Sequence, residues 1–125
     1  MQNSKKVIII DDEPDIVTFL TVLLEDEGYA TISAGNGKEG FEKIKQERPD
    51  LVLLDVTMPE KSGVRCYREL RENPDLKSIP VIIVTGVSKD FKNFISTRGH
   101  VPPPDGFVAK PIDKQDLINA ISKVL

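Results

Sequence analysis

The sequence predicts an α/β fold in which helices cover both faces of a five-stranded parallel sheet. Five short apolar runs alternate along the chain with five segments in which apolar residues recur at helical spacing. The runs are continuous, as is typical of strands buried on both faces of a parallel sheet. Right-handed crossovers leave few topologies, and doubly wound sheets of this size commonly take the strand order 2-1-3-4-5. At 125 residues the chain is expected to form one domain, 1–125.

The predicted strands are apolar runs bounded by residues that favour turns. The central one is the run from Leu51 to Leu54, which leads directly into Asp55 and is followed by Pro59 and Gly63. A short run of this kind is expected to be a fully buried strand with Asp55 at its C-terminal end. Strands are expected at residues 7–10, 29–34, 51–54, 81–84 and 107–109.

Five helices are expected after these strands. In the first, Pro14 stands at or near the first helical position behind an acidic N-cap region, and Gly28 is the predicted C-cap. The third begins after Gly63 and ends near Pro74. The apolar faces that define the five helices lie within residues 16–24, 37–47, 64–70, 89–98 and 117–125.

Composition and charge exclude several classes of function. A net charge of −3 gives no electrostatic footprint for direct binding of nucleic acid, and no polybasic run suggests a membrane surface. The apolar runs are far shorter than the roughly 20 residues that span a bilayer. Cys66 is the only cysteine and His100 the only histidine, so neither an internal disulfide nor a zinc site can form. A reducing, cytoplasmic location is therefore expected.

Chemically capable side chains stand at the C-terminal ends of the predicted strands. Carboxyl ends of parallel strands meet at one edge of the sheet, where ligands bind in open α/β folds. Taken singly, each residue has an ordinary explanation as a helix cap, a turn former or a solvated lysine. Their coincidence at one edge instead predicts a site composed of Asp11, Asp12, Asp55, Thr85 and Lys110.

Three carboxylates this close together need compensation. Two unit charges about 4 Å apart repel by about 4 kcal/mol at an effective dielectric near 20. The chain offers two means of offsetting this: the ammonium of Lys110, or a hard cation such as Mg²⁺ held by carboxylates. A cation, a lysine and a threonine hydroxyl together suit the oxygens of a phosphoryl group. Asp55 held in that field is a candidate nucleophile that would form an aspartyl phosphate.

Four motifs in order resemble the receiver domain of two-component response regulators, over essentially the whole chain from Lys6 to Leu125. They are Ile10-Asp11-Asp12-Glu13-Pro14, Leu54-Asp55 through Met58-Pro59 to Gly63, Val84-Thr85-Gly86 and Phe107-Val108-Ala109-Lys110-Pro111. The resemblance implies a flavodoxin-like sheet and a signalling module that catalyses only its own phosphotransfer and autodephosphorylation. It implies as partners a sensor histidine kinase or phosphotransfer protein, and an unknown downstream protein bound through helix 4, strand 5 and helix 5.

The resemblance also implies roles for single residues at the site. Asp55 is the implied phosphoacceptor, receiving the phosphoryl group in a Mg²⁺-dependent reaction. Asp11 and Asp12 are similar to the acidic pair that holds Mg²⁺, with Asp55 and the backbone carbonyl of Thr57 completing the protein ligands.

Three further residues of the resemblance belong to the switch. Thr85 is similar to the hydroxyl residue that moves toward the phosphoryl group, and Lys110 to the lysine that pairs with it. Phe107 falls on the aromatic position whose rotamer follows that movement. Family members usually have a cis peptide at this Lys-Pro pair, so we expect Lys110-Pro111 to be cis, against about 5–6% of X-Pro bonds in general.

The chain departs from the family pattern between Thr85 and Lys110, where the spacing is a few residues longer than usual. The excess lies in the Pro-rich stretch 99–106, so we expect a shortened or irregular helix 4, and a neutral insertion and a recognition role are both open. Val87 is apolar and offers a hydrolytic water no hydrogen bond. We therefore hypothesise a phosphoryl lifetime longer than that of fast chemotaxis-type receivers, which a dephosphorylation half-life of seconds would contradict.

Three alternative functions compete with a phosphorylatable receiver. An aspartate-nucleophile phosphatase of the haloacid dehalogenase type needs a second carboxylate two residues after the nucleophile, where this chain has Thr57. A flavin or nucleotide binder needs a Gly-rich phosphate loop after the first strand, and none is present. A degenerate receiver, used only for protein interaction, is disfavoured by the presence of all five site residues.

Overall fold

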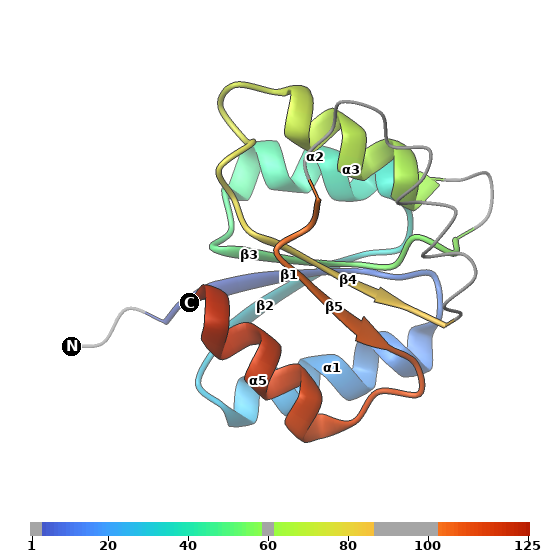
Figure 1. Ribbon diagram of the computed structural model, residues 1–125, viewed down its shortest axis with the longest axis vertical. Helices are drawn as coiled ribbons and strands as arrows, with labels where there is room; N and C mark the ends of the chain where they lie inside the picture. The colour runs from blue at the N-terminus through green and yellow to red at the C-terminus, as the bar shows by residue number, and fades with distance from the viewer. Residues whose placement is uncertain (1–3, 59–61, 87–102) are drawn as a thin grey trace.

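The computed structural model describes residues 4–58, 62–86 and 103–125, which form a parallel sheet between two helical layers (Figure 1). The strand order is β2-β1-β3-β4-β5, as the sequence predicts. The strands are β1 (Lys6–Ile10), β2 (Ala30–Ala34), β3 (Leu51–Leu54), β4 (Val81–Thr85) and β5 (Gly106–Ala109). The described helices are α1 (Pro14–Asp26), α2 (Gly37–Glu47), α3 (Ser62–Glu72) and α5 (Lys114–Val124).

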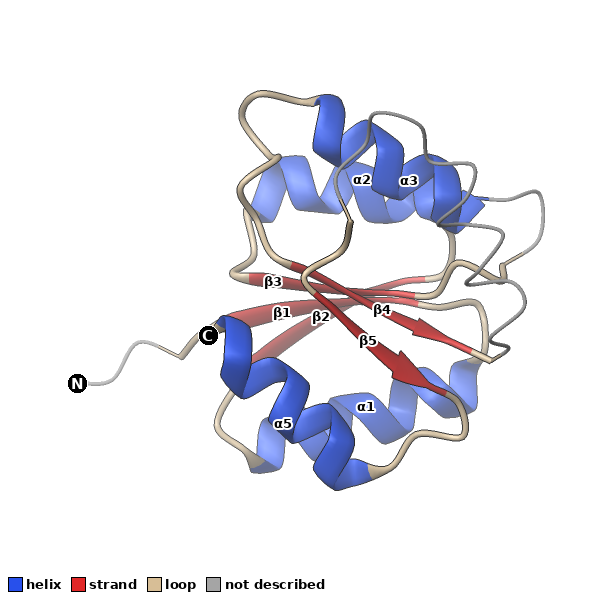
Figure 2. Ribbon diagram, in the orientation of Figure 1, coloured by secondary structure: helices blue, strands red, loops and turns tan. Residues whose placement is uncertain are grey.

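Helices α1 and α5 cover one face of the sheet, and α2 and α3 cover the other (Figure 2). Because successive strand residues point to opposite faces, each strand supplies both layers in turn. Ile8 and Ile10 pack on the side of α2 and α3, whereas Val7 and Ile9 pack on the side of α1 and α5. This two-sided burial is the reason that the strands are continuously apolar.

The helix ends follow their local sequence with one adjustment. Asn36 caps α2, its side-chain oxygen accepting a hydrogen bond from Glu39 N at 2.8 Å. The C-cap of α1 is Glu27 rather than the predicted Gly28, which follows it with a φ of 92°. Glycine adopts this left-handed conformation without the steric cost of a Cβ, so Gly28 still ends the helix from the position after the C-cap, and the cap itself lies one residue earlier than expected.

Helix α3 lies unusually close to the end of β3, and Gly63 permits this approach. A Cβ at position 63 would lie 2.7 Å from Val56 Cα and closer still to the carbonyl oxygen of Asp55. The first turn of α3 therefore rests directly on the Asp55–Val56 backbone. This close contact between α3 and the backbone fixes the path of the residues that follow β3.

The start of β5 is anchored by a network that no sequence motif indicated. Arg71, near the end of α3, forms an ion pair with Asp105 at 2.7 Å and donates to the carbonyl oxygens of Lys77 and Ile79. The same Asp105 carboxylate oxygen accepts from Val81 N at 2.8 Å. These bonds hold β5 against β4 at the edge opposite the predicted site.

Two predictions about the chain near β5 have different outcomes. The peptide bond Lys110-Pro111 is cis, as expected. The predicted helix at 89–98 and residues 99–102 of the Pro-rich stretch lie outside the described residues, and so does Val87. None of the helices in the described part of the chain has the length and apolar character of a membrane span.

Candidate functional site

The ends of three strands bring Asp11, Asp55 and Lys110 together at the carboxyl edge of the sheet. β1 and β3 are neighbours with Ile10 paired to Leu54, so Asp11 and Asp55 each follow their strand by one residue. Asp55 N donates to Ile10 O at 3.0 Å, and Lys110 N donates to Thr85 O at 2.8 Å. These backbone bonds fix the starting points of the site's side chains.

The ammonium of Lys110 lies among three carboxylates. Its Nζ is 2.8 Å from Glu13 Oε1, 2.9 Å from Asp11 Oδ2 and 3.3 Å from Asp55 Oδ2. The lysine side chain is 12% exposed, so water screens these contacts only in part. Lys110 is therefore the internal counter-charge that the sequence predicted for the acidic cluster.

Asp55 is buried and held on both of its carboxylate oxygens. Thr57 donates to Oδ1 twice, from its backbone N at 2.8 Å and from its hydroxyl at 2.6 Å. Oδ2 faces Lys110. An aspartate whose orientation is fixed from two sides suits a nucleophile, because little reorganisation is needed before it reacts.

Burial and neighbouring charges have opposite effects on the pKa values of Asp11 and Lys110 in this cluster. Burial raises the pKa of Asp11, although the nearby Lys110 ammonium and the hydrogen bond from the backbone N of Glu13 oppose the rise. Burial alone would lower the pKa of Lys110, but its bonds to Glu13 and Asp11 and the charge of Asp55 outweigh this, so that pKa is raised. The lysine therefore remains charged at any physiological pH, while Asp11 is ionised at a cost.

The donor set suits a hard divalent cation. Asp11, Asp12, Glu13 and Asp55 can each offer a carboxylate oxygen, and these oxygens lie within 4.8 Å of one another. Asp11 Oδ2 is buried and forms an ion pair with Lys110. It has no hydrogen-bond partner among the described residues. Oxygen-only donors with an excess of negative charge are what Mg²⁺ requires, so these residues fit it.

Thr85 and Phe107 occupy the neighbouring strands β4 and β5. The Thr85 side chain is fully buried, and its hydroxyl has no hydrogen-bond partner within the described part of the chain. A buried hydroxyl without a partner carries a desolvation cost that a new acceptor could relieve. Phe107 is half-buried and packs on the same side of the sheet as α2 and α3.

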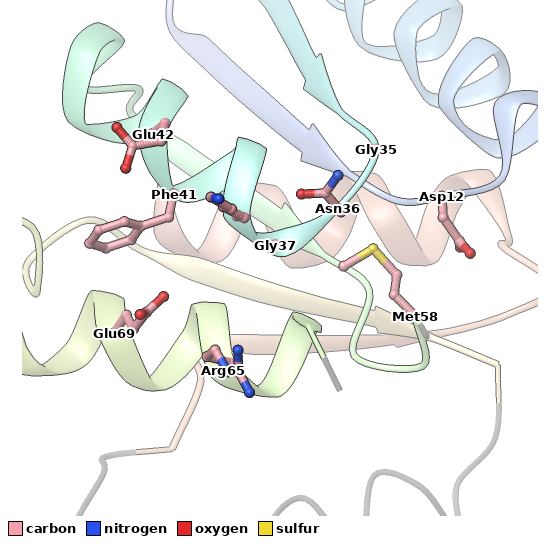
Figure 3. A pocket seen from close by; sticks show the side chains of 10 residues that line it. Asp12, Gly35, Asn36, Gly37, Phe41, Glu42, Met58, Arg65 and Glu69 are labelled. Atoms are coloured by element: carbon pink, nitrogen blue, oxygen red, sulfur yellow. The ribbon is translucent and has the colours of Figure 1, made fainter. Parts of the chain in front are cut away.

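A cavity of about 830 Å³ opens beside Asp12, between the start of α2, the loop after β3 and α3 (Figure 3). Its lining includes Phe41, Met58 and Arg65, but not Asp11, Asp55 or Lys110. The cavity therefore adjoins the carboxylate cluster without containing it. Of the site residues predicted from the sequence, Asp12 alone reaches into it.

Glu13 is the site residue that sequence reasoning missed. The sequence assigned it only to the acidic cap of the first helix, yet its carboxylate makes the shortest of the three contacts to Lys110. As the N-cap of α1 it makes no side-chain capping hydrogen bond. The available signal was its place as a third consecutive acid after β1, directed toward the same edge.

Comparison with known proteins agrees with this geometry. The family profile described as response regulator receiver domain matches residues 7–122. Protein PilH of Pseudomonas aeruginosa is 33% identical over 120 residues, which cover 96% of this chain and 97% of PilH. The alkaline phosphatase synthesis transcriptional regulatory protein PhoP of Bacillus subtilis is 30% identical over 98% of the chain, which spans only 49% of PhoP.

Solved structures agree as well. The signal receiver domain of a signal transduction histidine kinase from Syntrophus aciditrophicus superposes with a TM-score of 0.86 and 32% identity, over 98% of this chain and 90% of that one. Chemotaxis protein CheY4 of Vibrio cholerae superposes with a TM-score of 0.83 and 27% identity, over 98% of this chain and 100% of that one. The chain belongs to the response regulator receiver domain family, and it is a phosphorylatable receiver of two-component signal transduction.

Proposed function

We propose that Asp55 is the residue that accepts the phosphoryl group. The observation that carries the proposal is its position between fixed donors: Thr57 on one oxygen and the Lys110 ammonium 3.3 Å from the other. Asp11 is also buried, but its Oδ1 accepts from Glu13 N, and burial raises its pKa. Asp12 and Glu13 are exposed.

The reaction is an in-line displacement at phosphorus. A carboxylate oxygen of Asp55 forms a bond to phosphorus while the bond to the donor breaks, a P–N bond in a phosphohistidine or a P–O bond in an acyl phosphate. The leaving group keeps the electron pair, and the product is an aspartyl phosphate. Lys110 stabilises the charge on the phosphoryl oxygens, and Thr85 offers them a hydroxyl donor.

We assign Mg²⁺ to the carboxylates of Asp11, Asp12 and Asp55, with the backbone carbonyl of Thr57 as a further ligand. When bound, the cation supplies charge neutralisation of the transferring phosphoryl group. Receiver domains bind Mg²⁺ at an acidic site, and the oxygen cluster described above supports the same assignment for this chain.

The phosphoryl group would act as a switch through Thr85 and Phe107. Phosphorylation adds acceptor oxygens at a site where the buried hydroxyl of Thr85 has no partner among the described residues, so a conformation that moves Thr85 toward them is favoured. Receiver domains interact with histidine kinases or phosphotransfer proteins. For this chain we propose such a donor, and an unidentified target that docks on β5, α5 and the expected helix 4.

Incubation with acetyl phosphate, with and without Mg²⁺, tests the assignment by intact mass. We expect one added phosphoryl group that requires Mg²⁺, is absent in Asp55→Asn and persists in Asp15→Asn, a change of the same charge on an exposed residue of α1. An adduct that survives in Asp55→Asn would show that another side chain is the acceptor. No adduct in the unaltered protein would favour the degenerate receiver, which the family comparison does not favour.

The remaining proposals concern the context of the chain. We propose that residues 1–125 act as one receiver domain in the cytoplasm, without contact to nucleic acid or membrane. Its chemistry would be limited to its own phosphotransfer and autodephosphorylation. The net charge of −3 and the single cysteine support this reading.

A further inference from the structure

Hydrogen bonds from Glu13 and Thr57 occupy one oxygen each of Asp11 and Asp55, so the oxygens left for a divalent cation are those that Lys110 now contacts. Asp11 Oδ2 and Asp55 Oδ2 lie 2.9 Å and 3.3 Å from the ammonium. An ammonium and a divalent cation repel each other, so they cannot share these oxygens at such distances. Lys110 must therefore withdraw from Asp11 and Asp55 when the cation binds.

The withdrawal of Lys110 is limited by its backbone. Lys110 N donates to Thr85 O at 2.8 Å, so the residue stays at the end of β5 and only its side chain can move. One of its three carboxylate partners lies outside the pair of oxygens that the cation needs. That partner is Glu13, 2.8 Å from the ammonium.

Glu13 is suited to keep the lysine close. It stands at the N-cap of α1 without a side-chain capping bond, so its carboxylate is available to Lys110. Its side chain is 59% exposed, which leaves it room to follow the ammonium. Its backbone N donates to Asp11 Oδ1 at 2.9 Å and so ties its own position to the site.

We propose that Glu13 is a positioning residue that holds Lys110 beside Asp55 while a divalent cation occupies Asp11 and Asp55. This inference rests on the proposed function, because it gives the lysine a place from which to meet the incoming phosphoryl group. The competing possibility is that Glu13 is itself a ligand of the cation, since its carboxylate belongs to the same cluster of oxygens. The two roles differ in whether Glu13 acts through Lys110.

A double-mutant cycle on Mg²⁺ binding separates these roles. MgCl₂ is titrated into ¹⁵N-labelled protein, and the dissociation constant is taken from backbone amide shifts. Glu13→Gln removes the charge while keeping the shape, Lys110→Met removes the ammonium, and Asp15→Asn is the control for loss of one negative charge on the same helix.

We expect Glu13→Gln to weaken Mg²⁺ binding about fivefold in the unaltered background, because the displaced ammonium then lacks a charged partner. In the Lys110→Met background the same change is expected to cost less than about twofold, comparable to Asp15→Asn. An equal loss in both backgrounds would make Glu13 a ligand of the cation and overturn the proposal. So would a Glu13→Gln effect no larger than that of Asp15→Asn.

A second measurement keeps the proposal testable if Lys110→Met does not fold. With ¹³C-labelled lysine at saturating MgCl₂, the two ε-methylene protons of a held side chain give separate signals, whereas a free side chain averages them. We expect separate Lys110 signals in the unaltered protein and in Asp15→Asn, and averaged signals in Glu13→Gln. Separate signals in Glu13→Gln would overturn the proposal. Neither measurement requires phosphorylation, so a failure of this inference is distinguishable from a failure of Asp55 to accept phosphate.

Discussion

Replacing Gly63 by alanine tests whether the close approach of α3 fixes the position of Asp55. The added Cβ would lie 2.7 Å from Val56 Cα and inside the contact distance of the Asp55 carbonyl oxygen. Both neighbours are backbone atoms, so neither can yield by changing a rotamer. Asp55 N is also bonded to Ile10 O at 3.0 Å, which ties the end of β3 to β1.

The strain must therefore be relieved by moving α3 outward. The helix carries Cys66, Tyr67 and Leu70, each about 1% exposed and packed in the core on that side of the sheet. Overpacking of this kind typically costs about 1–3 kcal/mol, and we expect Gly63→Ala to lower the free energy of unfolding by that amount. With a urea m-value of roughly 1–3 kcal/mol/M, the unfolding midpoint would fall by about 1 M.

Urea unfolding followed by circular dichroism measures this loss, with Gly86→Ala as the matched control. A Cβ on Gly86 has no neighbour within 4 Å among the described residues, and its φ is not in the left-handed region. The control is expected to change stability by less than about 0.5 kcal/mol. Equal stability of the two variants would refute the reasoning, because it would mean that α3 does not rest on the Asp55–Val56 backbone.

Three further predictions follow from burial and charge. Burial raises the pKa of Cys66 to about 12, so iodoacetamide at pH 8 should label this thiol only after the protein unfolds. Intact mass measures the labelling, and rapid labelling of the native protein would contradict the prediction. Because burial raises the pKa of Asp11, the folded state holds the proton of the Asp11 carboxyl group more tightly than the unfolded chain does. The free energy of unfolding in Mg²⁺-free buffer should therefore fall as pH rises from the unfolded-state pKa to the folded-state pKa of Asp11. Asp11→Asn lacks this penalty and should unfold at higher urea than the unaltered protein at pH 7; a lower midpoint would contradict the assignment. Asp105→Ala leaves Arg71 and Val81 N without their shared acceptor and should cost roughly 1–3 kcal/mol in the same assay, whereas an unchanged midpoint would show that the network is not stabilising.

The sheet was predictable because its signals are local in sequence. A strand buried on both faces must be apolar at every position, and Leu51–Leu54 meets that requirement. Helix α1 begins at Pro14 and α3 precedes Pro74 as expected, because proline restricts the backbone wherever it stands. The boundaries that shift, among them the C-cap of α1 before Gly28, the start of β2 at Ala30 and the start of α3 at Ser62 rather than after Gly63, differ by one or two residues.

Only those parts of the site that follow directly from the strand order could be predicted from the sequence. Once the strand order is 2-1-3-4-5, the ends of β1 and β3 must be neighbours, and Asp11 and Asp55 follow from that alone. The contact between Glu13 and Lys110 joins residues 97 positions apart and depends on where two flexible side chains end. The pairing of Arg71 with Asp105 is of the same kind, and no pattern of spacing indicates either.

The fold does more than gather the acidic residues, because it prevents them from separating. Asp11 N donates to Ala34 O and Asp55 N to Ile10 O, so both aspartates extend the hydrogen-bonding of the sheet beyond its last paired residues. Moving the backbone of either aspartate away would break a backbone hydrogen bond at a buried edge, which costs about 1–3 kcal/mol. Among the residues that the structure describes, the repulsion is instead met by the single ammonium of Lys110, which faces three carboxylates. A site held in this way has a deficit of positive charge that a divalent cation could supply, and we propose that Asp55 then accepts a phosphoryl group, which brings negative charge of its own.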